Sequence, residues 1–123
     1  MNQVHAVTPF VMTHDLAASV NFFEGTLGFS CGFHMEGYAF LRRDKGAIRG
    51  LQVETGCAIA QQLIYLDCAD VDALYAALKP GLDCLDAGRV RAPFDQPYGM
   101  REFHVKDPNN AALMFGMDIP PSP

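Results

Sequence analysis

The hydrophobic pattern at the start of the chain predicts one strand followed by one helix. A short apolar run ends at Met12, and Asp15 stands where a side chain can cap the N-terminus of a helix. Apolar residues then recur at helical spacing, at Leu16, Val20, Phe23 and Leu27. Gly28 closes the pattern, because glycine readily takes the left-handed conformation that ends many helices.

The second half of the chain repeats this order. Asp70 is the second capping residue, and Val71, Leu74 and Leu78 follow it at helical spacing. Pro80 and Gly81 are predicted to stop the helix there, because proline lacks the backbone donor that a continuing helix uses.

Strand-like runs follow each predicted helix. They cover 30–36, 38–44 and 47–54 in the first half, and 83–94 (less clearly), 101–107 and 111–117 in the second. Hairpin turns are predicted at 44–46 and 108–110, where Asn110 can take a left-handed conformation. We therefore predict an α+β fold of two βαβββ modules, about 4–56 and 60–118, in a single domain that spans 1–119.

Each predicted module is too small to bury a core well, and one helix covers only one face of a small sheet. We expect the two modules to pair, so that their uncovered sheet faces form a cupped mixed sheet around a cavity. The proline-rich residues 120–123 are predicted to be a disordered tail.

Composition narrows the choice of partners. Nine basic and fourteen acidic residues give a formal net charge of −5, which disfavours nucleic acid and anionic membranes and favours a cationic ligand. The chain has no apolar stretch of roughly 20 residues and no signal-peptide pattern, so we expect a cytoplasmic protein with no membrane partner. The four cysteines lack Cys-x-x-Cys spacing, and we expect them to be buried free thiols.

Four stretches carry a family resemblance: DLAASVNFFEGTLGF, GYAFLRRDKGAIRGLQV, DVDALYAAL and GMREFHVKDPNNAALMF. Between about Val7 and Met117 the chain resembles the vicinal oxygen chelate superfamily, also called the glyoxalase/bleomycin resistance/dioxygenase group, and within it the bleomycin resistance proteins most. The resemblance implies paired βαβββ modules, a homodimer with its cups at the subunit interface and, in the enzymes, a divalent metal in the cup.

The resemblance also indicates where the ligands of that metal would stand. Counting from the capping aspartates and from the Asp-Pro turn gives Thr8, Leu63 and Met114, with the fourth position near Gly50 or at Gln52. Leucine and a lone thioether do not provide the donors that such a metal needs. We therefore expect no metal and no other cofactor.

Alternate positions along the predicted strands should line the cup, because side chains alternate on a strand. The predicted ligand-binding residues are Phe10, Phe33, Tyr38, Phe40, Gln52, Tyr65, Tyr98, Glu102, His104 and Met114. Aromatic side chains with a few polar groups suit an aromatic or cationic, drug-like small molecule.

Glu102 and His104 are the catalytic candidates. They share one face of a predicted strand, and Phe103 and Val105 share the other. A partly buried carboxylate beside an imidazole can exchange protons, whereas an exposed pair or a pair in a dimer interface would be structural. The basic residues Arg42, Arg43, Lys45 and Arg49 surround a predicted turn, where we expect a solvated loop.

Three functions stay open. The first is a metal-independent binding protein of the bleomycin-resistance type, which gives antibiotic resistance by sequestering its ligand in the cup at a dimer interface. The alternative is an atypical enzyme of the same superfamily that uses Glu102 and His104 as an acid-base pair. The third is a regulatory module that senses a metabolite.

Overall fold

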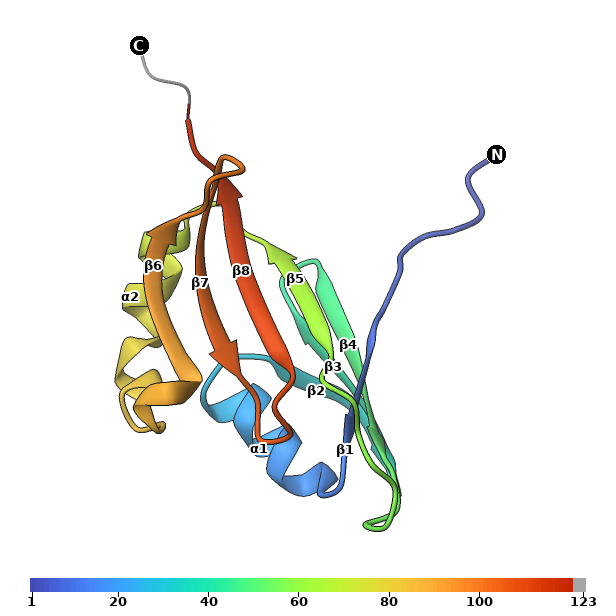
Figure 1. Cartoon of the computed structure of the whole chain (residues 1–123). Coiled ribbons are helices and arrows are strands. Elements are labelled where there is room, and N and C mark those ends of the chain that lie inside the picture. Colours follow the sequence, from blue (N-terminus) through green and yellow to red (C-terminus); the bar gives the residue numbers. More distant parts are fainter. Residues whose placement is uncertain (121–123) are drawn as a thin grey trace. The chain divides into compact units, whose positions relative to one another are not determined.

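The computed structural model of the chain describes residues 1–120, which form two compact units divided between Ala60 and Gln61. We call these units module 1 and module 2. Each contains four strands and one α-helix, so the predicted α+β fold of two βαβββ modules is confirmed. Figure 1 labels these elements along the chain. Apart from Pro120, the predicted tail lies outside the described residues.

Module 1 runs through β1 (Phe10–Thr13), α1 (Leu16–Gly25), β2 (Ser30–Met35), β3 (Tyr38–Arg43) and β4 (Gly46–Gln52). Its sheet has the order β1-β4-β3-β2; β1 is parallel to β4 and the other pairs are antiparallel. The carboxylate of Asp15 accepts the backbone N–H of Ala18 at 3.1 Å and caps α1, as predicted.

Module 2 runs through β5 (Leu63–Asp67), α2 (Val71–Leu82), a short 3-10 helix (Ala87–Arg89), β6 (Val90–Asp95), β7 (Met100–Lys106) and β8 (Ala112–Asp118). Its sheet order, β5-β8-β7-β6, repeats that of module 1, with β5 parallel to β8. Asp70 caps α2 through the N–H of Ala73.

The end of α2 differs from the prediction, because the helix continues through Pro80 to Leu82. Proline removes only its own backbone donor, and the N–H of Asp83 still closes the last turn on the carbonyl oxygen of Lys79 at 2.8 Å. A proline this close to a helix end therefore does not stop the helix.

Each helix covers one face of its own sheet and leaves the other face free of helix. In module 2 the rings of Phe103 and Phe115 stack under α2 with centroids 4.6 Å apart, and Tyr75 of α2 meets Phe103 edge-on. In module 1 the core contains Phe22, Phe23 and Phe29. These aromatic cores fix which side chains of each strand remain for the helix-free face.

Smaller features test the remaining expectations. Asn110 takes the predicted left-handed conformation, with φ of 67°. The four cysteines are unbridged, but none of them is buried, so the expectation of buried thiols is wrong. Among residues 1–120, no helix is long and apolar enough to cross a membrane.

Candidate functional site

The helix-free face of module 1 carries aromatic and aliphatic side chains in two rows. Strand pairing aligns Phe10, Arg49, Phe40 and Phe33 in one row, and Met12, Leu51, Tyr38 and Met35 in the next. Phe33 is 53% exposed and Met35 55% exposed, because nothing in module 1 covers these ends of the rows. We call this surface, defined by these eight residues, the module 1 face.

Arg49 lies in the middle of the module 1 face. Its Nε donates to Thr8 Oγ1 at 2.8 Å, its Nη1 donates to Tyr38 Oη at 2.5 Å, and its guanidinium carbon lies 5.0 Å from the centre of the Phe40 ring. The expectation of a solvated loop at Arg49 is wrong, because the residue belongs to the interior of β4 and is half-buried. Its neighbour Ile48 points to the covered face and fixes this orientation.

Gln52 faces the opposite way from the prediction. It pairs with the buried Thr13, and its Oε1 accepts the backbone N–H of Leu16 at 3.0 Å at the start of α1. Gln52 thus satisfies one of the free donors at a helix N-terminus, a structural role. Its assignment to the same face as Phe10 is corrected by this pairing.

The helix-free face of module 2 is more polar. Its two rows are Tyr65, Met114, His104 and Arg91, then Asp67, Gly116, Glu102 and Phe94. The guanidinium carbon of Arg91 lies 3.5 Å from the centre of the Phe94 ring, and that ring meets His104 edge-on at 5.0 Å. As predicted, Glu102 and His104 lie on this face, where they pair with Phe94 and Arg91, whereas Phe103 lies on the opposite face, against Tyr75 of α2.

Glu102 is the centre of a hydrogen-bonded cluster on this face. Its Oε1 accepts Nε2 of His104 at 2.8 Å and Nε2 of Gln96 at 3.1 Å. Its Oε2 accepts the hydroxyls of Tyr98 at 2.7 Å and Tyr65 at 3.0 Å. The Glu102 side chain is fully buried, so it is not the exposed group that one interpretation of the sequence allowed.

Two opposing effects act on the ionisation of Glu102. Burial raises its pKa, but hydrogen bonds from His104, Tyr98, Gln96 and Tyr65 outweigh burial and hold the pKa at about 2, below its usual 4.5. The same contacts act in reverse on the phenols. Desolvation and the bond to the Glu102 carboxylate raise the pKa of Tyr65, and that bond with desolvation raises the pKa of Tyr98.

These contacts define what the cluster can do chemically. An ionised carboxylate only accepts hydrogen bonds, so Nε2 of His104 carries a proton toward Glu102. Glu102 is a poor proton acceptor at neutral pH, because four donors and a lowered pKa stabilise its anion. The carboxylate therefore orients the surrounding donors, and His104, whose side chain is 27% exposed, is the accessible member of the pair.

The structure places most of the predicted site residues on the two helix-free faces, each within its own module. The module 1 face holds Phe10, Phe33, Tyr38 and Phe40, and module 2 holds Tyr65, Glu102, His104 and Met114, with Tyr98 joined to them through Glu102. Sequence reasoning missed Arg49, Phe94 and Gln96. The strand-period alternation of Ile48, Arg49 and Gly50 was the signal that puts Arg49 on the side of the strand opposite Ile48, but only strand pairing shows that this is the face of Phe40.

The residues at the metal-ligand positions do not fit a divalent metal. The two sheets have the same strand order, so β4 of module 1 corresponds to β8 of module 2. On β8, Met114 pairs with Tyr65 and His104. On β4, Arg49 pairs in the same way with Phe10 and Phe40, and is therefore the counterpart of Met114. The fourth position, expected near Gly50 or at Gln52, is therefore occupied by a guanidinium. The four positions hold the hydroxyl of Thr8, the guanidinium of Arg49, the alkyl group of Leu63 and the thioether of Met114. These groups do not form a set of donors suited to a divalent metal.

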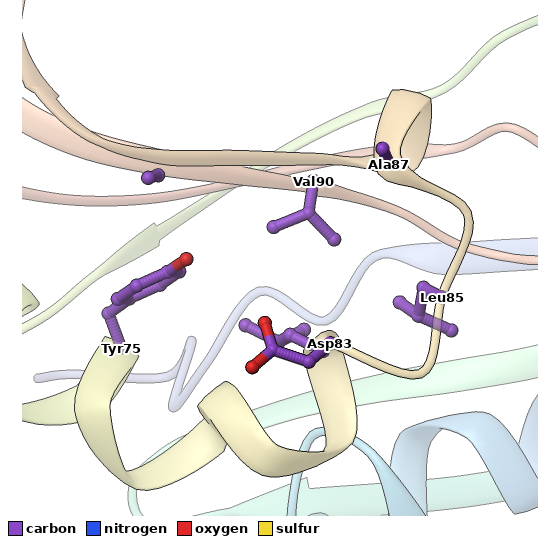
Figure 2. A pocket seen from close by; sticks show the side chains of 7 residues that line it. Tyr75, Asp83, Leu85, Ala87 and Val90 are labelled. Carbon is purple, nitrogen blue, oxygen red and sulfur yellow. The ribbon is translucent and has the colours of Figure 1, made fainter.

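A separate pocket of about 260 Å³ lies on the covered side of module 2 (Figure 2). Tyr75 and Asp83 border it from α2 and its end, and Leu85, Ala87 and Val90 border it from the chain that leads into β6. None of the sequence-predicted site residues lines this pocket, so it is distinct from the Glu102 cluster.

Comparison with known proteins identifies relatives of this architecture. The family model described as the Glyoxalase/Bleomycin resistance protein/Dioxygenase superfamily matches residues 3–115. A search of curated proteins gives no significant match.

Several solved structures share the fold. The bleomycin-binding protein of bleomycin-producing Streptomyces verticillus, solved with copper(II)-bleomycin, is 25% identical, with a TM-score of 0.79 over 94% of this chain and 97% of its own. The bleomycin resistance determinant of transposon Tn5 is 21% identical, with a TM-score of 0.79 over 94% and 98%. A lactoylglutathione lyase of Agrobacterium tumefaciens is 16% identical, with a TM-score of 0.71 over 94% and 95%. The shared fold thus hosts both binding proteins and an enzyme.

Proposed function

The chain belongs to the glyoxalase/bleomycin resistance protein/dioxygenase superfamily, and from this we propose that it is a metal-independent binding protein, which sequesters an aromatic small molecule as a homodimer. The single observation that carries the proposal is the module 1 face, where aromatic and aliphatic side chains remain exposed. An exposed apolar patch on a globular protein marks a site that binds a ligand or another molecule.

The aromatic ligand class has more support than the cationic one. Phe33 and Tyr38 contact each other on the module 1 face, with ring centroids 6.1 Å apart, and rings of this kind stack on flat ligands. The eight residues of the module 1 face include no carboxylate that would attract a cationic ligand. The buried carboxylate of Glu102 already accepts four donors, and Arg49 would repel a cation from the middle of the module 1 face.

A binding role is favoured over catalysis for the same reasons. The enzyme alternative requires Glu102 to take up and release a proton, and its environment stabilises the anion strongly. The residues at the metal-ligand positions supply no donor set for a Lewis acid. Relatives solved with bleomycin supply the analogy for sequestration, and resistance to a drug is the cellular role that would follow from it.

The proposal is tested by titrating the purified protein with metal-free bleomycin in a calorimeter and with N-phenylnaphthylamine, a neutral aromatic dye, in a fluorimeter. Saturable binding of either compound supports a binding function. If neither binds to a folded protein, the proposal is wrong. Light scattering on the same sample measures the mass, for which we expect twice that of the chain.

The module 1 face is tested with Phe33→Ser, which removes a ring that is 53% exposed on an edge strand. We expect this variant to weaken binding of the dye. The matched control is Ile119→Ser, which removes an exposed apolar side chain that lies beyond β8 and outside both faces. Equal binding by both variants would contradict the assignment of the ligand to the module 1 face.

A further inference from the structure

Arg49 differs from Arg101 in having no acidic partner. Arg101 is held by two carboxylates, Asp72 at 2.9 Å and Asp95 at 3.0 Å. Arg49, which is half-buried, forms no ion pair with any described residue, and the acceptors of its two hydrogen bonds are neutral hydroxyls. A partly desolvated charge without a counter-charge is unfavourable, so this guanidinium favours an anion.

The surroundings of Arg49 also fix its orientation. Thr8 and Tyr38 hold Nε and Nη1, and the guanidinium carbon lies 5.0 Å from the centre of the Phe40 ring. No described residue accepts a hydrogen bond from Nη2. A guanidinium has five N–H donors in a rigid fork that matches a carboxylate or sulfonate, so a held arginine with unused donors is suited to bind such a group.

The position of Arg49 joins this charge to apolar surface. Phe10 and Phe40 flank it in its row, and Leu51 follows it on the same face of β4. We infer that Arg49 binds the acidic group, a carboxylate or a sulfonate, of an aromatic ligand whose ring system lies on the module 1 face. This inference rests on the proposed function and specifies its ligand class as aromatic acids.

Two dyes that differ only in an acidic group test the inference. Anilinonaphthalene sulfonate is N-phenylnaphthylamine with one added sulfonate, so the ratio of their affinities measures what that group contributes. Arg49→Met removes the charge and keeps a side chain of similar length against Phe40. We expect the variant to lose about tenfold or more in affinity for the sulfonate dye, because charge-assisted hydrogen bonds are lost, and to change its affinity for the neutral dye much less.

Two further variants make the result specific. Arg49→Lys keeps the charge without the planar fork, and we expect an intermediate loss for the sulfonate dye. Lys45→Gln removes one exposed positive charge at the turn before β4, and we expect it to leave both affinities unchanged. Thermal unfolding of each variant checks that the fold is intact.

The outcomes separate the inference from the proposed function. A clearly larger loss for the sulfonate dye than for the neutral dye in Arg49→Met supports the inference. If Arg49→Met weakens both dyes equally, or neither, Arg49 does not bind the acidic group, and the proposed function still stands on the neutral dye. If the unmodified protein binds neither dye, the inference fails together with the proposal on which it rests.

Discussion

The hydroxyl of Tyr65 lies directly over the backbone of Gly116. A Cβ at Gly116 would stand 1.8 Å from Tyr65 Oη, so the absence of a side chain at this position of β8 is what lets the phenol cross the strand. Gly116 pairs with Glu102 on β7, and the phenol therefore reaches the buried carboxylate on the neighbouring strand. One glycine thus contributes to the assembly of the cluster around Glu102.

Gly116→Ala should displace Tyr65 and break its hydrogen bond with Glu102. We expect a loss of about 2 kcal/mol in the free energy of unfolding, because the added methyl overpacks a filled site and leaves a buried acceptor short of one donor. Urea unfolding measures this loss. In a Tyr65→Ala background, Gly116→Ala should lower the free energy of unfolding much less, because the added methyl no longer collides with the phenol.

The matched control is Gly32→Ala in β2, where the nearest atom to an added Cβ is 4.0 Å away. This change should alter stability by no more than about 0.5 kcal/mol. If the two alanine variants lose the same free energy, the collision with Tyr65 is not the cause.

Glu102→Gln should destabilise the protein in a pH-dependent way. The pKa of Glu102 is about 2 in the folded chain against its usual 4.5, so its ionised form contributes stability above about pH 4.5 that is lost as the pH falls toward 2. At pH 7 we expect the free energy of unfolding of the variant to be about 2 to 3 kcal/mol lower than that of the unmodified protein. This difference, the gap, should shrink progressively as the solution is acidified. Urea unfolding at several pH values measures the gap.

The control for this series is Glu36→Gln, which changes an exposed carboxylate in the turn between β2 and β3. Its gap to the unmodified protein should stay small at every pH. A Glu102→Gln gap that is independent of pH would mean that packing, and not ionisation, determines the cost.

Asp107 should show the opposite dependence. Its Oδ1 accepts the backbone N–H groups of Asn109 and Ala111, both at 2.8 Å, while Oδ2 is buried without a partner among the described residues. Burial raises the pKa of Asp107 against these hydrogen bonds, so its contribution to stability is present below the usual 3.8 and falls as the pH rises through the raised pKa.

Asp107→Asn keeps the accepting oxygen and cannot ionise. As the pH rises from about 3 to 7, we expect the stability of the variant relative to the unmodified protein to increase, measured as the difference in their free energies of unfolding. Asp107→Ala, which removes the acceptor as well, should be less stable than both at every pH. A stability difference between the aspartate and asparagine proteins that does not change with pH would rule out this account.

The sequence was sufficient to predict the two modules, because their signals are local. Asp15 and Asp70 cap helices whose apolar residues recur at helical spacing, and Asn110 provides the left-handed turn before β8. Faces could be predicted where apolar residues alternate strictly, as for Phe103 and Val105 against Glu102 and His104. These features depend on residues a few positions apart.

The candidate site was less predictable, because it depends on strand register and on distant partners. Gln52 and Arg49 lie on opposite faces of β4, and only the pairing with β1 and β3 decides which of them shares the face of Phe40. The burial of Glu102 depends on Tyr65, which is far away in sequence and reaches it only after β5 pairs with β8. Neither relationship is encoded by local spacing.

Binding of an aromatic small molecule to a helix-free sheet face can be located residue by residue. Isotope-labelled protein is titrated with N-phenylnaphthylamine, and amide proton-nitrogen correlation spectra are recorded. We expect saturable shifts at strand residues of the module 1 face, with Phe33, Phe40 and Arg49 among them. Shifts confined to the pocket beside Tyr75 and Val90 that Figure 2 shows, or no shifts at all, would mean that the module 1 face does not bind the ligand.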